Sequence, residues 1–175
     1  RYRVAKAMNR AAHLLPFVEE EYRRITGRHH GGPLVTYKVD DADAVLITMG
    51  TASTTARSVV DTLRARGKKV GLAKLRHFRP FPVDKVCELA ATVGRIGVMD
   101  RCYTYGAAGP AYTEVVAALF GGLHRPIVRN FIAGLGGRDV TPEAIEEMYE
   151  SLLKDRGPEV EWIGLKRRKR VTTHG

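Results

Sequence analysis

The sequence has little cysteine and no long run of apolar residues. Its 175 residues include two cysteines, Cys87 and Cys102, which fall in different predicted elements and form no C-x-x-C. Neither a disulfide scaffold nor a cysteine-ligated zinc or iron–sulfur site is encoded, and a reducing cytoplasm is the expected setting. The longest mainly apolar stretches, such as 44–49 and 127–133, are far shorter than the roughly 20 residues that cross a bilayer. We therefore expect no membrane-spanning segment.

Recognisable catalytic motifs are also missing. The sequence contains no G-x-S-x-G or H-E-x-x-H, and its six histidines lack the spacing of metal ligands. The turn 49–54 offers a glycine and several hydroxyl groups at a helix start, where an anion can bind. It lacks both the G-x-G-x-x-G spacing of a dinucleotide site and the G-K-S/T ending of a phosphate loop. We interpret it as helix capping and expect no complete active site in this chain.

The charge is unbalanced, with 29 Lys and Arg residues against 19 Asp and Glu residues, a formal net charge of +10. Such a charge can attract nucleic acid, a membrane surface or an acidic protein. Five of the cations lie in one run, 166–170, which contains no aromatic residue to stack on bases. We therefore predict a solvated basic tail over 166–175, and we expect no nucleic-acid or membrane partner.

The sequence is rich in alternating strand-like and helix-like segments, which follow a helical lead-in over 1–27. Apolar spacing predicts one short helix to Leu14 and a second from Pro16 to Thr26, because proline breaks a helix interior. Strands are predicted at 34–39, 43–49, 69–75, 95–100 and 126–133. Helices are predicted at about 51–66, from Pro82, at 107–120 and from Thr141, before a short segment 160–165. This order is typical of one layered α/β domain, which we assign to residues 28–165.

Three loops combine glycine or proline with charged and aromatic residues, and we interpret them as candidate interfaces. The corner 79–82 is rigid because two prolines flank an aromatic residue, although a plain strand-to-helix connection fits equally well. Segment 100–110 follows a strand at the edge where ligands collect, but its Asp-Arg pair can also be a buried ion pair. Loop 134–139 is glycine-dense and suits close approach of a partner domain or a phosphate. The candidate residues are Arg79, Phe81, Asp100, Arg101, Gly106, Gly109, Gly136, Gly137, Arg138 and Asp139.

Several short sequence segments, taken in order along the chain, resemble one protein family. They are Tyr37-Lys38 with 41–43, the strand into Met49-Gly50-Thr51, the stretch 69–72 leading to 79–82, the segment 100–110, and 134–141. Together, over residues 11–165, they resemble the second domain of the α subunit of thiamine-diphosphate-dependent 2-oxoacid:ferredoxin oxidoreductases. Pyruvate:ferredoxin oxidoreductase, also called pyruvate synthase, is the member that they resemble most.

The resemblance implies a three-layer α/β/α fold like the transketolase C-terminal domain. Its five-stranded mixed sheet would have the order 1-3-2-4-5, with the first strand antiparallel. The implied enzyme converts a 2-oxoacid and coenzyme A to acyl-CoA and CO₂ while it reduces ferredoxin, using thiamine diphosphate, Mg²⁺ and 4Fe-4S clusters. The family's catalytic glutamate and cluster cysteines are expected in other domains and subunits, so we assign this chain no catalytic, cofactor or metal residue.

The implied partners are the pyrimidine-binding domain of the same subunit and the pyrophosphate-binding, γ-type and ferredoxin-like subunits, with ferredoxin reached through the holoenzyme. The expected role is therefore that of an accessory domain that holds catalytic domains in register. Two other classes stay open. A transketolase or the β chain of a 2-oxoacid dehydrogenase shares the fold, but is not expected to carry the phrase 134–139. A stand-alone anion- or nucleotide-binding module would use the Gly50 and Gly136 loops.

Overall fold

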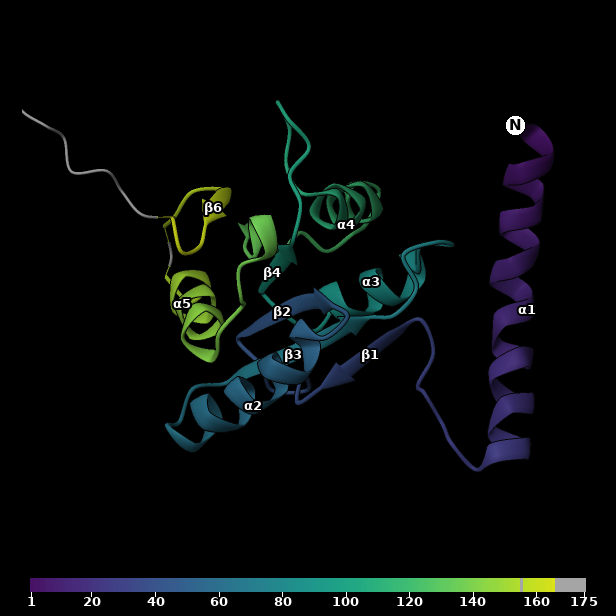
Figure 1. Cartoon of the computed structure of the whole chain (residues 1–175), viewed down its shortest axis with the longest axis horizontal. Helices are drawn as coiled ribbons and strands as arrows, with labels where there is room; N and C mark the ends of the chain where they lie inside the picture. The colour runs from purple at the N-terminus through teal and green to yellow at the C-terminus, as the bar shows by residue number, and fades with distance from the viewer. Residues whose placement is uncertain (155, 166–175) are drawn as a thin grey trace, which may run out of the picture.

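The computed structural model describes residues 1–154 and 156–165, and a six-stranded mixed sheet forms its centre (Figure 1). The strands are β1 (Leu34–Tyr37), β2 (Ala44–Met49), β3 (Val70–Leu75), β4 (Arg95–Asp100), β5 (Ile127–Ile132) and β6 (Val160–Trp162). Their order is β1-β3-β2-β4-β5-β6; β1 is antiparallel to β3, and the other neighbours are parallel. The predicted fold class is confirmed. The predicted tail over 166–175 lies outside the described residues.

Helices cover both faces of this sheet, as the three-layer prediction requires. Helices α2 (Ala52–Ala65) and α5 (Pro142–Leu152) lie on one face, and α3 (Val83–Ala90) and α4 (Pro110–Phe120) lie on the other (Figure 1). Strand β2 is buried on both faces of the sheet. Val45 and Ile47 pack in the α3–α4 core, whereas Leu46 packs in the α2–α5 core. A parallel strand that is buried on both faces is apolar at nearly every position.

The helix starts were predicted with mixed success. Thr141 is the N-cap of α5, where its hydroxyl accepts a hydrogen bond from the Ala144 amide at 3.3 Å, as predicted. The predicted start of the third helix near Ala107 was wrong. That helix, α4, begins at Pro110, because proline suits the first helical position, where its missing N–H is not needed.

The break predicted at Pro16 was also wrong, because a single helix, α1, runs from Tyr2 to Thr26. Proline lacks the N–H that would donate to the carbonyl four residues earlier, so it removes one hydrogen bond of the helix. The turns on either side keep theirs, and the helix continues to Gly27, which takes the left-handed conformation and closes it. A local proline penalty therefore did not outweigh the helical preference of the residues around it.

The predicted count of five strands was one short. Strand β6 has only three residues and pairs in parallel with β5, with Phe131 opposite Glu161. So short a strand leaves no alternating pattern to recognise, although segment 160–165 had been noted. Strand β1, in contrast, ends two residues earlier than predicted, because Lys38 has a left-handed backbone with φ of 53°.

Gly97, in the middle of β4, lets the α2–α5 core close over the sheet. A Cβ atom there would lie 2.8 Å from the Phe131 ring and 2.9 Å from Leu46. We predict that Gly97→Ala lowers the free energy of unfolding by about 1–3 kcal/mol through overpacking. Gly94→Ala is the matched control, because nothing lies within 4 Å of its Cβ position. Urea denaturation measures both, and equal stability of the two variants would contradict this packing.

Candidate functional site

The loops that carry the candidate residues meet at one edge of the molecule. Strands β2 to β6 are parallel, so the segments after Met49, Leu75, Asp100, Ile132 and Trp162 all leave the sheet at its carboxyl edge. This is the edge at which ligands and partners of open α/β sheets usually bind. The structure thus gathers the three candidate loops there, together with the residues that follow β6.

Asp100 is the anchor of this edge. Its side chain is buried, with 5% of its surface exposed, and each carboxylate oxygen is engaged. One oxygen accepts from the Ala111 amide at 2.8 Å, and the other accepts from the Tyr112 amide at 3.1 Å and from the Asn130 side chain at 3.0 Å. A carboxylate at the N-terminus of α4 satisfies amides that have no partner within the helix. Asp100 therefore holds the start of α4 against the ends of β4 and β5.

Burial and hydrogen bonding act on the pKa of Asp100 in opposite directions. Burial raises it above the ordinary aspartate value, because a charged carboxylate loses its hydration. The hydrogen bonds from Ala111, Tyr112 and Asn130 favour the charged form and oppose that shift. Among the described residues, Asp100 makes no ion pair with Arg101. The interpretation of these two residues as a buried ion pair was therefore wrong, although the role of Asp100 is structural.

Gly109 fits closely beneath this carboxylate. A Cβ atom on Gly109 would lie 2.1 Å from an Asp100 oxygen, so no larger residue fits without moving the cluster. The Gly109 amide donates to the Asn130 side-chain oxygen at 2.8 Å, which completes the network. Gly106, in contrast, lies in the open part of the loop with φ of 78° and nothing near its Cβ position. The two candidate glycines thus serve the anchor and the loop tip respectively.

Aromatic side chains form an exposed ridge above this anchor. The β4–α4 loop rises from the edge at the top of Figure 1, and Tyr105 at its tip is 95% exposed. Tyr103 lies between Tyr105 and Trp162, with ring centroids 6.1 Å and 4.8 Å away. Trp162 is the last residue of β6, and 40% of its surface is exposed. We call Tyr103, Tyr105 and Trp162 the aromatic ridge.

The glycine-dense loop lies beside the aromatic ridge. Gly136 and Gly137 have left-handed backbones, and they shape a tight turn before Arg138. Arg138 is exposed, and its guanidinium donates one long hydrogen bond, 3.4 Å, to the Gly164 carbonyl oxygen; Asp139 is also exposed. Around this turn is a hollow of about 420 Å³, whose lining residues include Leu135, Gly136, Arg138, Trp162 and Leu165.

The corner 79–82 lies at the same edge but faces a different part of the surface. The Arg79 guanidinium pairs with Glu114 of α4 and lies over the Phe78 ring, 4.3 Å from its centroid. Phe81 is half-buried against the α3–α4 core and meets Phe78 edge to face. These contacts fix the corner to its own domain, and Phe81 lines a groove toward α1 rather than the surface near Arg138.

The turn after β2 satisfies its own polar groups. The amides of Ser53 and Thr54 donate to the carbonyls of Gly50 and Thr51, and the Ser53 hydroxyl is buried against Thr48 at 2.8 Å. Within residues 1–154 and 156–165, no group of three or more His, Cys, Asp and Glu side chains could hold a metal ion. In the same part of the chain, no helix is both long and apolar enough to cross a bilayer.

Two polar residues of the site were missed in the sequence. Arg129 and Asn130 interrupt the apolar run of β5, and both are buried. Arg129 donates to the carbonyl oxygens of Ser151, in the last turn of α5, and of Lys154 just beyond it, whereas Asn130 joins the Asp100 cluster. The sequence could have revealed them, because an arginine and an asparagine within a strand that is covered on both faces require buried hydrogen-bond partners.

Comparison with solved structures shows the class of fold. The chain resembles a split-gene transketolase, solved as an inactive β4 tetramer, with a TM-score of 0.54 over 72% of this chain and 43% of that one, at 15% identity. It also resembles the 2-oxoglutarate:ferredoxin oxidoreductase from Magnetococcus marinus, solved with 2-oxoglutarate, coenzyme A and succinyl-CoA. There the TM-score is 0.52 over 76% of this chain and 21% of that one, at 19% identity. The fold is therefore transketolase-like.

Sequence comparison shows the family. Residues 42–145 match pyruvate:ferredoxin oxidoreductase core domain II. The chain is 39% identical over 172 residues to ketoisovalerate oxidoreductase subunit VorA of Pyrococcus horikoshii, and 39% identical over 168 residues to pyruvate synthase subunit PorA of Methanothermobacter thermautotrophicus. Each match covers 95% of this chain, but only 44% and 42% of those subunits. The chain belongs to the pyruvate:ferredoxin oxidoreductase core domain II family, as the resemblance predicted.

A substitution at Asp100 tests whether its carboxylate anchors α4 at the carboxyl edge. In Asp100→Asn, one acceptor oxygen becomes an NH₂ group that faces donors, so we predict a loss of about 1–3 kcal/mol in the free energy of unfolding. Asp139→Asn, at an exposed position on the same edge, should change it by less than about 0.5 kcal/mol. Guanidinium denaturation followed by circular dichroism compares them. Equal stability of Asp100→Asn and the wild type would show that the carboxylate does not anchor α4.

Proposed function

We propose that this chain is an accessory, assembly-forming domain of a thiamine-diphosphate-dependent 2-oxoacid:ferredoxin oxidoreductase. The observation that carries the proposal is that the carboxyl edge has its buried polar residues engaged within the domain and aromatic and arginine side chains exposed. Asp100 and Asn130, which could otherwise act on a ligand, are fully engaged in holding α4. The exposed side chains of the edge include Tyr105, Trp162, Arg101 and Arg138, and these residue types are enriched at the energetic centres of protein interfaces.

The reaction proposed for the complete enzyme is conversion of a 2-oxoacid and coenzyme A to acyl-CoA and CO₂, with reduction of ferredoxin. The names of the relatives support the 2-oxoacid class, because they include both pyruvate synthase and ketoisovalerate oxidoreductase subunits. We propose pyruvate as the substrate. Thiamine diphosphate, Mg²⁺ and 4Fe-4S clusters would be held by other parts of that enzyme, and the described residues supply no metal-binding group.

The partners follow from the same proposal. The carboxyl edge of this domain would contact a pyrimidine-binding domain of the same subunit, and the assembly would include pyrophosphate-binding, γ-type and ferredoxin-like subunits. The domain proper would span 28–165, since strands β1 to β6 form one sheet within that range. Residues 1–27 would be a helical lead-in, which α1 supports by standing apart from the sheet (Figure 1).

Arg138 tests this assembly role. We predict that Arg138→Glu weakens assembly of the complete oxidoreductase, because it reverses a charge beside the aromatic ridge. The stability of the domain itself should change by no more than about 0.5 kcal/mol, since the side chain is exposed and its hydrogen bond to Gly164 is long. Size-exclusion chromatography with light scattering measures assembly, and thermal melting measures stability.

The control is Lys154→Glu, which reverses an exposed charge just beyond α5, on the opposite edge of the sheet. It should leave assembly intact. If Arg138→Glu lowers the melting temperature while the complex still assembles, the loop supports only its own domain, and this interface is contradicted.

A further inference from the structure

Helix α1 carries an apolar seam that its own chain does not bury. None of its 25 residues is buried, and large apolar side chains such as Val4, Val18 and Ile25 are 58–70% exposed. Seven of its apolar positions follow a strict alternation of four- and three-residue steps over three heptads. They are Val4, Met8, Ala11, Leu15, Val18, Tyr22 and Ile25. This spacing is typical of a helix that packs along its whole length against another element. We call it the α1 seam.

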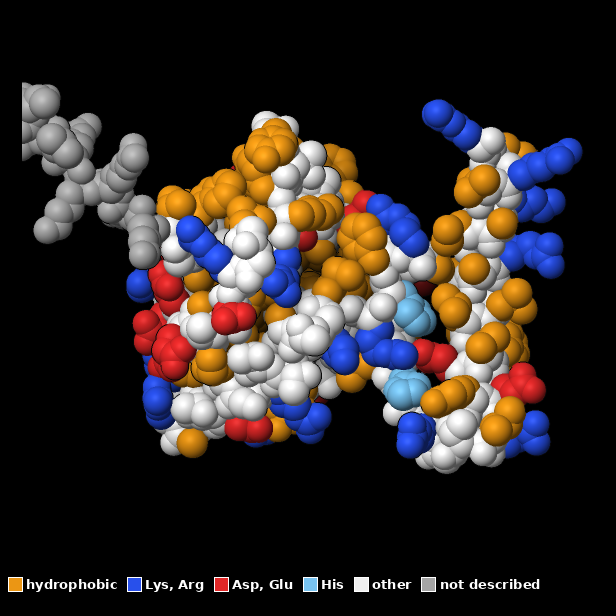
Figure 2. Space-filling view, viewed as in Figure 1, with side chains coloured by type: hydrophobic (Ala, Val, Ile, Leu, Met, Phe, Trp, Pro, Cys, Tyr) orange, Lys and Arg blue, Asp and Glu red, His pale blue; other side chains and the backbone are white. Residues whose placement is uncertain are grey.

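The α1 seam faces the rest of the domain across an open gap. In the upper half of α1, most Lys and Arg side chains point away from the domain, whereas hydrophobic side chains gather on the side that faces it (Figure 2). Only Ala11, Leu15 and Glu19 are half-buried. Glu19 ties the helix to the domain through Arg76 at 2.7 Å, with the His77 ring nitrogen 3.9 Å away. One polar contact near the middle of α1 therefore holds it beside the domain.

Helix α4, which lies on the same face of the sheet as α3 (Figure 1), has a second exposed apolar face. Its exposed positions Thr113, Val116, Ala117 and Phe120 follow helical spacing and include no charged residue, and Phe120 is 76% exposed. The outer face of α5, in contrast, includes Glu147 and Glu150. A helix that is apolar on both faces is normally covered on both. The outer face of α4 therefore also lacks its covering.

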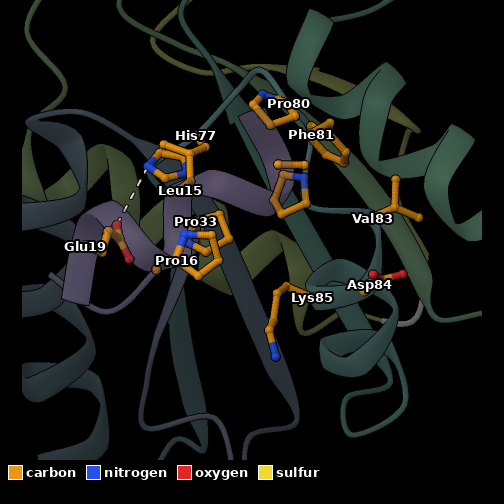
Figure 3. Close-up of a pocket in the computed structure, with 13 residues that line it drawn as sticks. Leu15, Pro16, Glu19, Pro33, His77, Pro80, Phe81, Val83, Asp84 and Lys85 are labelled. Carbon is orange, nitrogen blue, oxygen red and sulfur yellow. Dashed lines mark ion pairs between the residues drawn. The ribbon is translucent and has the colours of Figure 1, made fainter. Parts of the chain in front are cut away.

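A groove lies between the middle of α1 and the domain. It has a volume of about 390 Å³, and Leu15 and Pro16 of α1 lie on one side with Pro80, Phe81 and Val83 on the other (Figure 3). Its lining is mainly apolar, with Glu19 and His77 at one end and Asp84 and Lys85 at the other. An occupant of this space would contact both walls at once.

We propose that the α1 seam, this groove and the outer face of α4 form one docking surface, and that its occupant is the part of a PorA- or VorA-like subunit that this chain does not span. The inference rests on the proposed function. The chain covers only 42–44% of those relatives, so more than half of such a subunit is available to fill the space. Uncovered apolar surfaces of this kind mark interaction sites.

A second copy of the chain fits this surface less well. Two α1 helices would pair along the whole seam, but Ala11 and Leu15 are already half-buried toward the domain, and the groove stays open beside them. The first ten residues also include four cations, at positions 1, 3, 6 and 10, and no acidic residue. Two parallel copies would place these cations together, and the occupant that we propose has an acidic rim at this end of the helix.

Two methionines provide the test, because Met8 on the α1 seam and Met49 at the carboxyl edge are each 36% exposed. Oxidation by hydrogen peroxide follows exposure, and peptide mass spectrometry reads the two sites separately. In the isolated 175-residue chain, we expect Met8 and Met49 to oxidise at similar rates. In the complete oxidoreductase, we expect Met8 to oxidise about tenfold more slowly.

The two sites separate this inference from the proposed function. If Met49 becomes protected in the complete enzyme but Met8 does not, the docking surface is wrong and the assembly role stands. If neither becomes protected, both proposals are overturned. If Met8 is protected in the isolated chain by a dimer that sedimentation velocity detects, the occupant is a second copy and our assignment is wrong.

A pair of variants checks that the seam itself makes the contact. Met8→Glu should reduce the yield of assembled enzyme several-fold, whereas His13→Glu, at an exposed position on the opposite face of α1, should not. Both positions are exposed, so both isolated variants should melt with the wild type. Equal assembly of the two variants would overturn the docking surface.

Discussion

The hydrogen bonds that Asp100 accepts from the first amides of α4 and from Asn130 are the constraint on which the carboxyl edge depends. They join the ends of β4 and β5 to the start of α4, and they require a glycine at position 109. With α4 fixed, the loop from Arg101 to Ala108 must leave the sheet as a projection. That projection carries the aromatic ridge, so a buried polar cluster determines where the exposed aromatic side chains lie.

The domain presents two surfaces of different chemistry. The carboxyl edge combines the aromatic ridge with Arg101 and Arg138, and it is polar enough to remain exposed in the isolated domain. The α1 seam and the outer face of α4 are mainly apolar, and the ion pair between Glu19 and Arg76 ties α1 to the domain. A domain placed between others in a larger enzyme needs two such surfaces. Their difference also explains why substitutions can test them separately.

The sequence predicted those features that depend on nearby residues. The strands and the Thr141 cap follow from local hydrophobic patterns and turn chemistry, whereas the order of the sheet came from the family resemblance, because pairing joins distant segments. The hydrogen-bond partners of Asp100 were missed because Ala111 and Asn130 are 11 and 30 residues away. The three-residue β6 was too short for a pattern, and Pro16 was weighed alone against a helix of 25 residues.

The central claim is that this domain assembles an active site without containing one. Isothermal titration calorimetry of the purified 175-residue chain with thiamine diphosphate and Mg²⁺ tests it most directly. The account predicts no saturable heat of binding, because Asp100 and Asn130 at the carboxyl edge are engaged in holding α4 and the described residues offer no metal-binding group. Saturable binding of thiamine diphosphate at micromolar concentration would contradict it.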